Sequence, residues 1–99
     1  MDTQATLVVT AVPNPEEGAA MQEYLAGVMP LLLGAGGTPV KRLKVDAVVH
    51  GRPNGMVLVM DFPSTEAIDG LFGSDNYAAL VPARDRGFRE MNIQVARAI

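Results

Sequence analysis

The chain has 99 residues, enough for one hydrophobic core but not two, so we expect a single domain over residues 1–99. A hydrophobic fraction of 48% indicates a globular protein, the lack of cysteine excludes disulfides, and a net charge of −3 argues against nucleic acid binding. No uncharged apolar stretch is long enough to span a membrane and no secretory signal pattern opens the chain, so we expect a cytoplasmic location.

The first part of the chain predicts a strand followed by a helix. Residues 5–12 are rich in β-branched side chains, which favours a strand. Asn14 is a good N-cap and Pro15 suits the first helical position, so we expect the helix to begin there. Pro30 predicts a kink, and the glycine-rich residues 34–37 predict the end of the helix. Steps of three and four residues mark its apolar face: Met21, Tyr24, Leu25, Val28 and Leu32.

Residues 38–50 predict a long, polar second strand at an edge of the sheet. Leu43 lies on one face of this strand, while Arg42 and Lys44 lie on the other, which we expect to be solvated. Pro53-Asn54-Gly55 then predicts a hairpin turn, because Asn-Gly favours the backbone conformations that such turns require.

The second half predicts a strand, two helical segments and a last strand. Residues 56–62 form the strand, and Ser64 is the expected N-cap of the helix that follows. Ser74 predicts the cap of a second helical segment, which carries an apolar stripe as far as Phe88. Residues 89–98 alternate between apolar and polar side chains and predict the final strand.

The order of these elements is β-α-β-β-α-β, which is typical of an α+β, ferredoxin-like fold with an antiparallel sheet. In that arrangement the helices cover one face of the sheet. Residues 5–12 and 56–62 nevertheless carry apolar side chains on both faces, with Leu7 on one and Val8 on the other. A monomer would leave an apolar face in water, so we expect a homodimer that covers it.

Several motifs in the chain resemble the domain of unknown function 1330 family. They are Gly36-Gly37 before a strand, Asp61-Phe62-Pro63-Ser64-Thr65-Glu66-Ala67, Ser74-Asp75-Asn76-Tyr77 and Pro82-Ala83-Arg84, and the resemblance covers about Leu7 to Ala96. It implies the dimeric α+β barrel superfamily, in which two ferredoxin-like protomers pack their sheets together. The family has no established reaction, although the superfamily includes cofactor-free monooxygenases, lactone isomerases and haem-degrading enzymes. The chain departs from the family at His50, where an acidic residue is common.

Two residues are candidates for acid–base catalysis. His50 is the only histidine, and histidine is the side chain most often used to transfer protons in enzymes. Its alternative role is a solvated side chain at the end of a strand. Asp61 lies on the same strand face as Val57 and Val59, where a carboxyl could act as acid or base. The alternative for Asp61 is a structural hydrogen bond to the nearby helix start or to an arginine.

Tyr77 and Arg84 are the candidate ligand-binding residues. They stand two helical turns apart and therefore share a helix face, where Arg84 could bind a carboxylate or oxyanion and Tyr77 could donate a second hydrogen bond. The alternative is structural, with Tyr77 packed under the helix and Arg84 paired with an acid such as Asp61. With one histidine and no cysteine we expect no metal site, and no cofactor-binding motif is present.

These residues leave two functions open. The first is a homodimeric binding or accessory module for a small apolar acid or a protein partner, which the lack of a clear acid–base pair favours. The alternative is a small cofactor-free enzyme, monooxygenase- or isomerase-like, acting on an apolar or aromatic metabolite. In that mechanism His50 or Asp61 moves the proton while Tyr77 and Arg84 stabilise an oxyanion, so all four must line one cavity.

Overall fold

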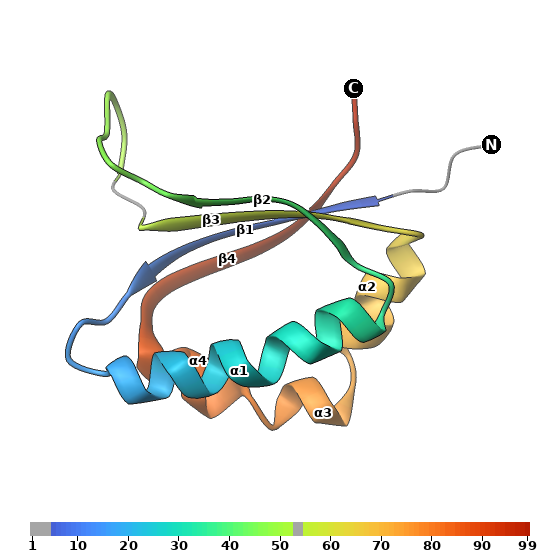
Figure 1. Ribbon diagram of the computed structural model, residues 1–99, viewed down its shortest axis with the longest axis horizontal. Coiled ribbons are helices and arrows are strands. Elements are labelled where there is room, and N and C mark those ends of the chain that lie inside the picture. The colour runs from blue at the N-terminus through green and yellow to red at the C-terminus, as the bar shows by residue number, and fades with distance from the viewer. Residues whose placement is uncertain (1–4, 53–54) are drawn as a thin grey trace.

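A computed structural model describes residues 5–52 and 55–99, which form a four-stranded sheet and four helices (Figure 1). Pro53 and Asn54 of the predicted hairpin turn lie outside the described residues. In chain order the elements are β1 (Ala5–Pro13), α1 (Gly18–Gly34), β2 (Thr38–Lys44), β3 (Met56–Phe62), α2 (Thr65–Phe72), α3 (Asp75–Ala78), α4 (Val81–Gly87) and β4 (Phe88–Ala96).

The strands lie in the order β2-β3-β1-β4, and every neighbouring pair is antiparallel. The crossover through α1 joins β1 to β2, and the crossover through α2, α3 and α4 joins β3 to β4, which confirms the predicted ferredoxin-like topology. Figure 1 shows these helices on one side of the sheet. We call this side the helix-side face and the opposite side the outer face; no described helix covers the outer face.

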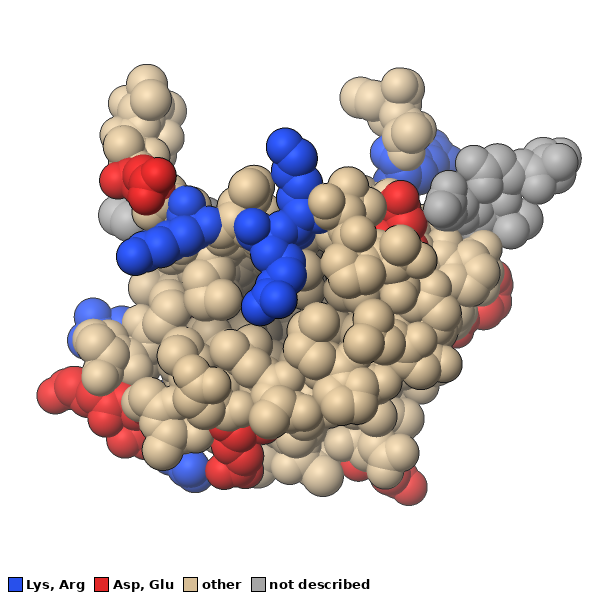
Figure 2. Space-filling model, viewed as in Figure 1, with Lys and Arg blue, Asp and Glu red and all other residues tan. Residues whose placement is uncertain are grey.

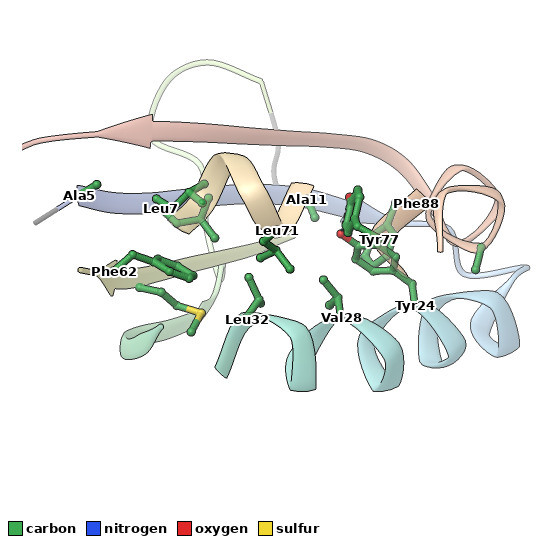
Figure 3. Packing of buried hydrophobic residues seen from close by; sticks show 13 residues of the cluster. Ala5, Leu7, Ala11, Tyr24, Val28, Leu32, Phe62, Leu71, Tyr77 and Phe88 are labelled. Carbon is green, nitrogen blue, oxygen red and sulfur yellow. Dashed lines mark hydrogen bonds between the residues drawn. The ribbon is translucent and has the colours of Figure 1, made fainter. Parts of the chain in front are cut away.

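The hydrophobic core lies between the helix-side face and the helices. Leu7 of β1 and Met60 of β3 are paired across the sheet, and both are fully buried. Phe62 and Ile68 are also inaccessible and extend the core towards α2. Helix α1 packs onto this core through side chains one turn apart, as its sequence periodicity predicts (Figure 3): Tyr24, Val28 and Leu32.

Several predicted helix ends are confirmed. The Ser64 and Ser74 hydroxyls cap α2 and α3, each accepting a hydrogen bond from the backbone N–H three residues later, at 3.1 and 3.2 Å. Helix α1 runs on through Pro30 and ends just before Gly36, whose φ of +93° lies in the left-handed region that favours glycine. Local sequence chemistry therefore determines where these helices begin and end.

Two helix boundaries differ from the prediction. Helix α1 begins at Gly18 rather than at Pro15. Asn14 forms a turn instead, because its side-chain and carbonyl oxygens accept bonds from the backbone N–H groups two and three residues later. The segment expected to be one helix through Phe88 is two short helices, α3 and α4, and Phe88 opens β4. Pro82 lies in the first turn of α4, where a helix needs no backbone donor.

Strand β2 is shorter than predicted, because its partner runs out. Lys44 is paired with Met56, the first residue of β3, so the ladder ends there rather than at residue 50. Residues 45–52 form a loop that rises on the outer side of the sheet in Figure 1. The final strand also shifts slightly, to Phe88–Ala96 in place of 89–98.

A β-bulge at Val40 reverses the faces of the rest of β2. Pro39 pairs with Met60 and Lys41 pairs with Val59, so Val40 is an extra residue without a counterpart on β3. Side chains alternate along a strand, and one extra residue therefore moves every later side chain to the opposite face.

Candidate functional site

A cavity of about 730 Å³ lies between the helix-side face and α1. All four strands contribute to its walls, α1 closes one side, and Phe72 of α2 also lines it. The walls are predominantly apolar: Val9, Leu25, Val28, Met29, Met56, Leu58, Met91 and Ile93 are among the lining residues. Pockets that hold drug-sized ligands have about this volume and this apolar character, so the cavity is the candidate functional site.

Two basic side chains, Arg42 and Lys44, also line this cavity. Because of the bulge they stand opposite Leu58 and Met56, on the helix-side face of β2; the sequence predicted the solvated edge strand, but not that these side chains would face the helices. Figure 2 shows basic side chains gathered over β2, above a hollow on the same face of the molecule. Both residues remain exposed, and within the described chain neither forms an ion pair.

The charge of the cavity lining is therefore entirely positive. Among the described lining residues there is no aspartate or glutamate, although the whole chain carries a net charge of −3. Two cations within a Debye length of each other and of an apolar cavity favour an anionic group at that position. The arrangement suits a ligand with an apolar body and an acidic end.

A hydrogen-bonded chain of four side chains begins at the cavity wall (Figure 3 shows the two tyrosines). Tyr24, on α1, lines the cavity, and its hydroxyl lies 2.9 Å from the Tyr77 hydroxyl of α3. Arg84 of α4 donates from Nη1 to Tyr77 Oη at 3.1 Å, and from Nε to Asp85 Oδ1 at 3.1 Å. Burial, and then the hydrogen bond to Tyr77, raise the pKa of Tyr24, so this phenol stays neutral.

The same chain of hydrogen bonds affects Arg84. The hydrogen bond to Tyr77 raises the pKa of Arg84, which therefore stays a cation. Tyr77 is 4% exposed and packs edge-on against Phe72 and Tyr24, with ring centroids 4.8 and 6.2 Å apart. Although Tyr77 and Arg84 lie in separate short helices rather than on one, they are in contact as their spacing suggested.

The structure does not bring the four predicted site residues together. His50 lies in the exposed loop after β2, and Asp61 lies on the outer face, where its carboxylate accepts a hydrogen bond from Thr6 at 2.9 Å. None of the four lines the large cavity, and Arg84 alone lines a second, smaller one. Arg84 pairs with Asp85, not with Asp61. In the described residues, no group of three or more His, Asp or Glu side chains could hold a metal ion.

Sequence reasoning identified the apolar helix face that lines the cavity, but it did not predict the cavity's polar side chains. Arg42 and Lys44 belong to a basic cluster that is visible in the sequence, but the bulge that turns them towards the cavity has no clear signal there. Tyr24 was assigned to the core because it falls on the apolar stripe of α1. Its hydroxyl was the available signal, since a buried phenol needs a hydrogen-bond partner.

Comparison with protein families places the chain in one of them. The model of the family described as Domain of unknown function (DUF1330) matches residues 5–99, and the chain belongs to this family. A comparison with curated proteins found no significant match. Among the described residues, none of the helices has the length and apolar character needed to cross a membrane.

Solved structures share the fold at low sequence identity. A protein of unknown function from Rhodopseudomonas palustris has a TM-score of 0.84 at 14% identity, covering 100% of this chain and 85% of that one. SnoaB, a cofactor-independent oxygenase from Streptomyces nogalater, has a TM-score of 0.69 at 11% identity, covering 98% of this chain and 94% of that one. A dimeric ferredoxin-like protein of unknown function from Bacteroides fragilis has a TM-score of 0.63 at 10% identity, covering 97% of both chains. These likenesses show a common fold.

Proposed function

We propose that this member of the DUF1330 family is a homodimeric binding module that holds a small apolar acid in the cavity between its sheet and α1. The observation that carries the proposal is the cavity's composition, with apolar walls and, among the described lining residues, Arg42 and Lys44 as the charged ones. A module for a protein partner is less well supported, because the recess is concave and its volume of about 730 Å³ suits a small molecule.

The two parts of the site would have different effects on binding. Burial of the ligand's apolar body would supply most of the affinity, at about 25 cal/mol per Å² removed from water. Arg42 and Lys44 are exposed, and exposed ion pairs contribute only about 0–1 kcal/mol each. The cations would therefore orient the ligand and select acids over neutral analogues.

The homodimer is supported by the outer face of the sheet. Val8 pairs with Val59 there, and Thr10 pairs with Val57, so the centre of this face is apolar or weakly polar. A second copy packed on this face would bury it. The Bacteroides fragilis protein that shares the fold is described as dimeric. Static light scattering should give a molar mass of about twice 10.5 kDa, the mass of one chain. A mass near 10.5 kDa at micromolar concentration would exclude the dimer.

The alternative is a cofactor-free enzyme, which is the description of SnoaB. Acid–base catalysis in the cavity has little support, because its described lining contains neither a carboxylate nor an imidazole. Tyr24 and Lys44 are the described lining residues that could still exchange a proton; the raised pKa of Tyr24 disfavours the phenolate that a base would need, and Lys44 is exposed to solvent. Binding without turnover is therefore the better reading of this site.

Calorimetric titration with octanoic acid and octan-1-ol tests the binding proposal. We expect the acid to bind more tightly than the alcohol, and Arg42→Gln and Lys44→Gln each to weaken acid binding by about two- to fivefold. Lys41→Gln is the matched control, because Lys41 belongs to the same strand, pairs with Val59 on the outer face and does not line the cavity. It removes the same charge and should leave acid binding unchanged.

Two results would count against the proposal. Equal loss of acid binding in Lys41→Gln and Arg42→Gln would mean that net charge, and not the cavity lining, attracts the acid. Unchanged acid binding in Val9→Phe, which places a large ring in the cavity, would place the ligand elsewhere, provided that urea unfolding shows the variant is folded. Loss of the bound acid over time, detected by mass spectrometry, would favour the enzymatic alternative.

A further inference from the structure

A second cavity, of about 480 Å³, lies beside β4 and α4. Phe88, Met91 and Ile93 line both this cavity and the large one, so the two spaces adjoin along β4. Unlike the large cavity, the second one is lined by charged residues of both signs. Its cations are Arg84 and Arg89.

A β-bulge places these residues around the second cavity. Phe88 pairs with Pro13 and Glu90 pairs with Val12, so Arg89 is an extra residue of β4 without a counterpart on β1. In a regular strand, residues an odd number of positions apart face opposite sides of the sheet. Because of the extra residue, Phe88 and Met91 face the same side and line the same cavity. Bulges that redirect side chains are frequent at sheet edges and next to binding sites.

The two arginines retain donors for a ligand. Arg84 uses Nε for Asp85 and one Nη1 hydrogen for Tyr77, and a guanidinium carries five N–H donors. Tyr77 is buried and fixes the position of Arg84 from behind. Arg89 forms no ion pair within the described chain.

The acidic residues of the second cavity already have cationic partners. Asp85 pairs with Arg84, and Glu90 pairs with Arg52 from the loop after β2. An incoming anion would therefore meet Arg89 and the unused donors of Arg84 rather than an unopposed carboxylate. This differs from the large cavity, whose described lining contains Arg42 and Lys44 but no acidic residue.

The two pairs of cations lie at opposite edges of the sheet. Arg42 and Lys44 are on the edge strand β2, while Arg89 is on the edge strand β4 and Arg84 is on α4 beside it. The sheet is three inter-strand spacings of about 4.8 Å wide, or roughly 14 Å. The large cavity spans this width, because its lining includes residues of both edge strands.

From this placement we infer that the ligand carries an acidic group at each end of an extended apolar body, one held by Arg42 and Lys44 and the other by Arg84 and Arg89. The inference rests on the proposed function, because the apolar body occupies the same large cavity. It narrows the ligand class from apolar acids to long α,ω-diacids and their close relatives.

Calorimetric titration with dodecanoic acid and with dodecanedioic acid tests the second anion site separately from the proposed binding of a monoacid. A second carboxylate left in an apolar space would lower affinity, because burying an unpaired charge is costly. With the second anion site the diacid should instead bind about three- to tenfold more tightly than the monoacid. Arg89→Gln should remove that advantage, and Arg84→Lys should reduce it while keeping a cation at that position.

Arg86→Gln is the matched control, because Arg86 lies in α4, pairs with Glu17 and lines neither cavity. It should preserve the advantage of the diacid. A diacid that binds no more tightly than the monoacid, or an advantage that survives in Arg89→Gln, would overturn the second anion site. If the monoacid still binds and its binding depends on Arg42, the proposed function stands without the second anion site. If neither acid binds, the proposed function fails as well.

Discussion

Replacing Tyr77 with phenylalanine should destabilise the protein more than replacing Tyr24, although both hydroxyls belong to one buried pair. Tyr77 Oη accepts from Arg84 and shares a hydrogen bond with Tyr24, while the Tyr24 hydroxyl has only the bond to Tyr77 among the described contacts. Tyr77→Phe therefore removes both bonds and leaves the Tyr24 hydroxyl unpaired at a site that is 4% exposed.

The expected costs follow from these contacts. An unpaired buried hydroxyl costs about 1–3 kcal/mol, and a lost hydrogen bond that leaves no orphan costs about 0.5–1.5 kcal/mol. We therefore expect Tyr77→Phe to lower the free energy of unfolding by about 2–3 kcal/mol and Tyr24→Phe by about 1 kcal/mol. In both variants the ring remains, so edge-on packing such as that of Tyr24 against Phe88, at 5.7 Å, is preserved.

Urea unfolding at one fixed protomer concentration measures these differences, because stability would depend on concentration in a dimer. With an m-value of about 1–3 kcal/mol/M, a loss of about 2 kcal/mol shifts the midpoint by roughly 0.7–2 M. The double variant should cost less than the two single variants together, since it leaves no orphaned hydroxyl. Equal losses of unfolding free energy in the two single variants would refute the larger contribution of the Tyr77 hydroxyl. So would a double variant whose loss equals the sum of the two single losses.

Three further predictions concern stability. Gly87→Ala should destabilise the fold by about 1–3 kcal/mol, because a Cβ there would lie 2.6 Å from the backbone nitrogen of Met21. Gly70→Ala in α2 meets open space and should instead stabilise the fold by about 0.4–1 kcal/mol. Thermal unfolding of both variants tests this contrast. Ser74→Ala should cost about 1 kcal/mol, since it removes the N-cap of α3, and no change in the urea midpoint would contradict the cap. The raised pKa of Tyr24 means that the unfolded chain loses a proton above about pH 10 that the folded chain keeps, so the free energy of unfolding should fall by about 1.4 kcal/mol per pH unit from that point. Urea titrations from pH 9 to 11 should show this slope, and Tyr24→Phe should lose the part that Tyr24 contributes.

Features that depend on short-range chemistry could be predicted from the order of the residues. Ser64 and Ser74 predicted helix starts, because a hydroxyl before a helix satisfies a free backbone donor whatever lies further away. The three- and four-residue steps of α1 predicted its buried face, because side chains at those steps lie on one side of a helix. The element order then restricted the topology to a ferredoxin-like arrangement, and the motifs from Gly36 to Arg84 indicated the family.

Which polar side chains line the site depends on how distant parts of the chain pack together. Arg42 lies at the cavity because Val40 is left unpaired in β2, and Arg89 lines the second cavity beside another bulge. A bulge forms where pairing with the neighbouring strand requires one extra residue, which depends on strands distant in the sequence. The contact between Tyr24 and Tyr77, 53 residues apart, likewise exists because α1 and α3 pack on the same face of the sheet. One extra residue in a strand reverses the faces of all that follow, so alternation along a strand cannot by itself show which of its side chains face the helices.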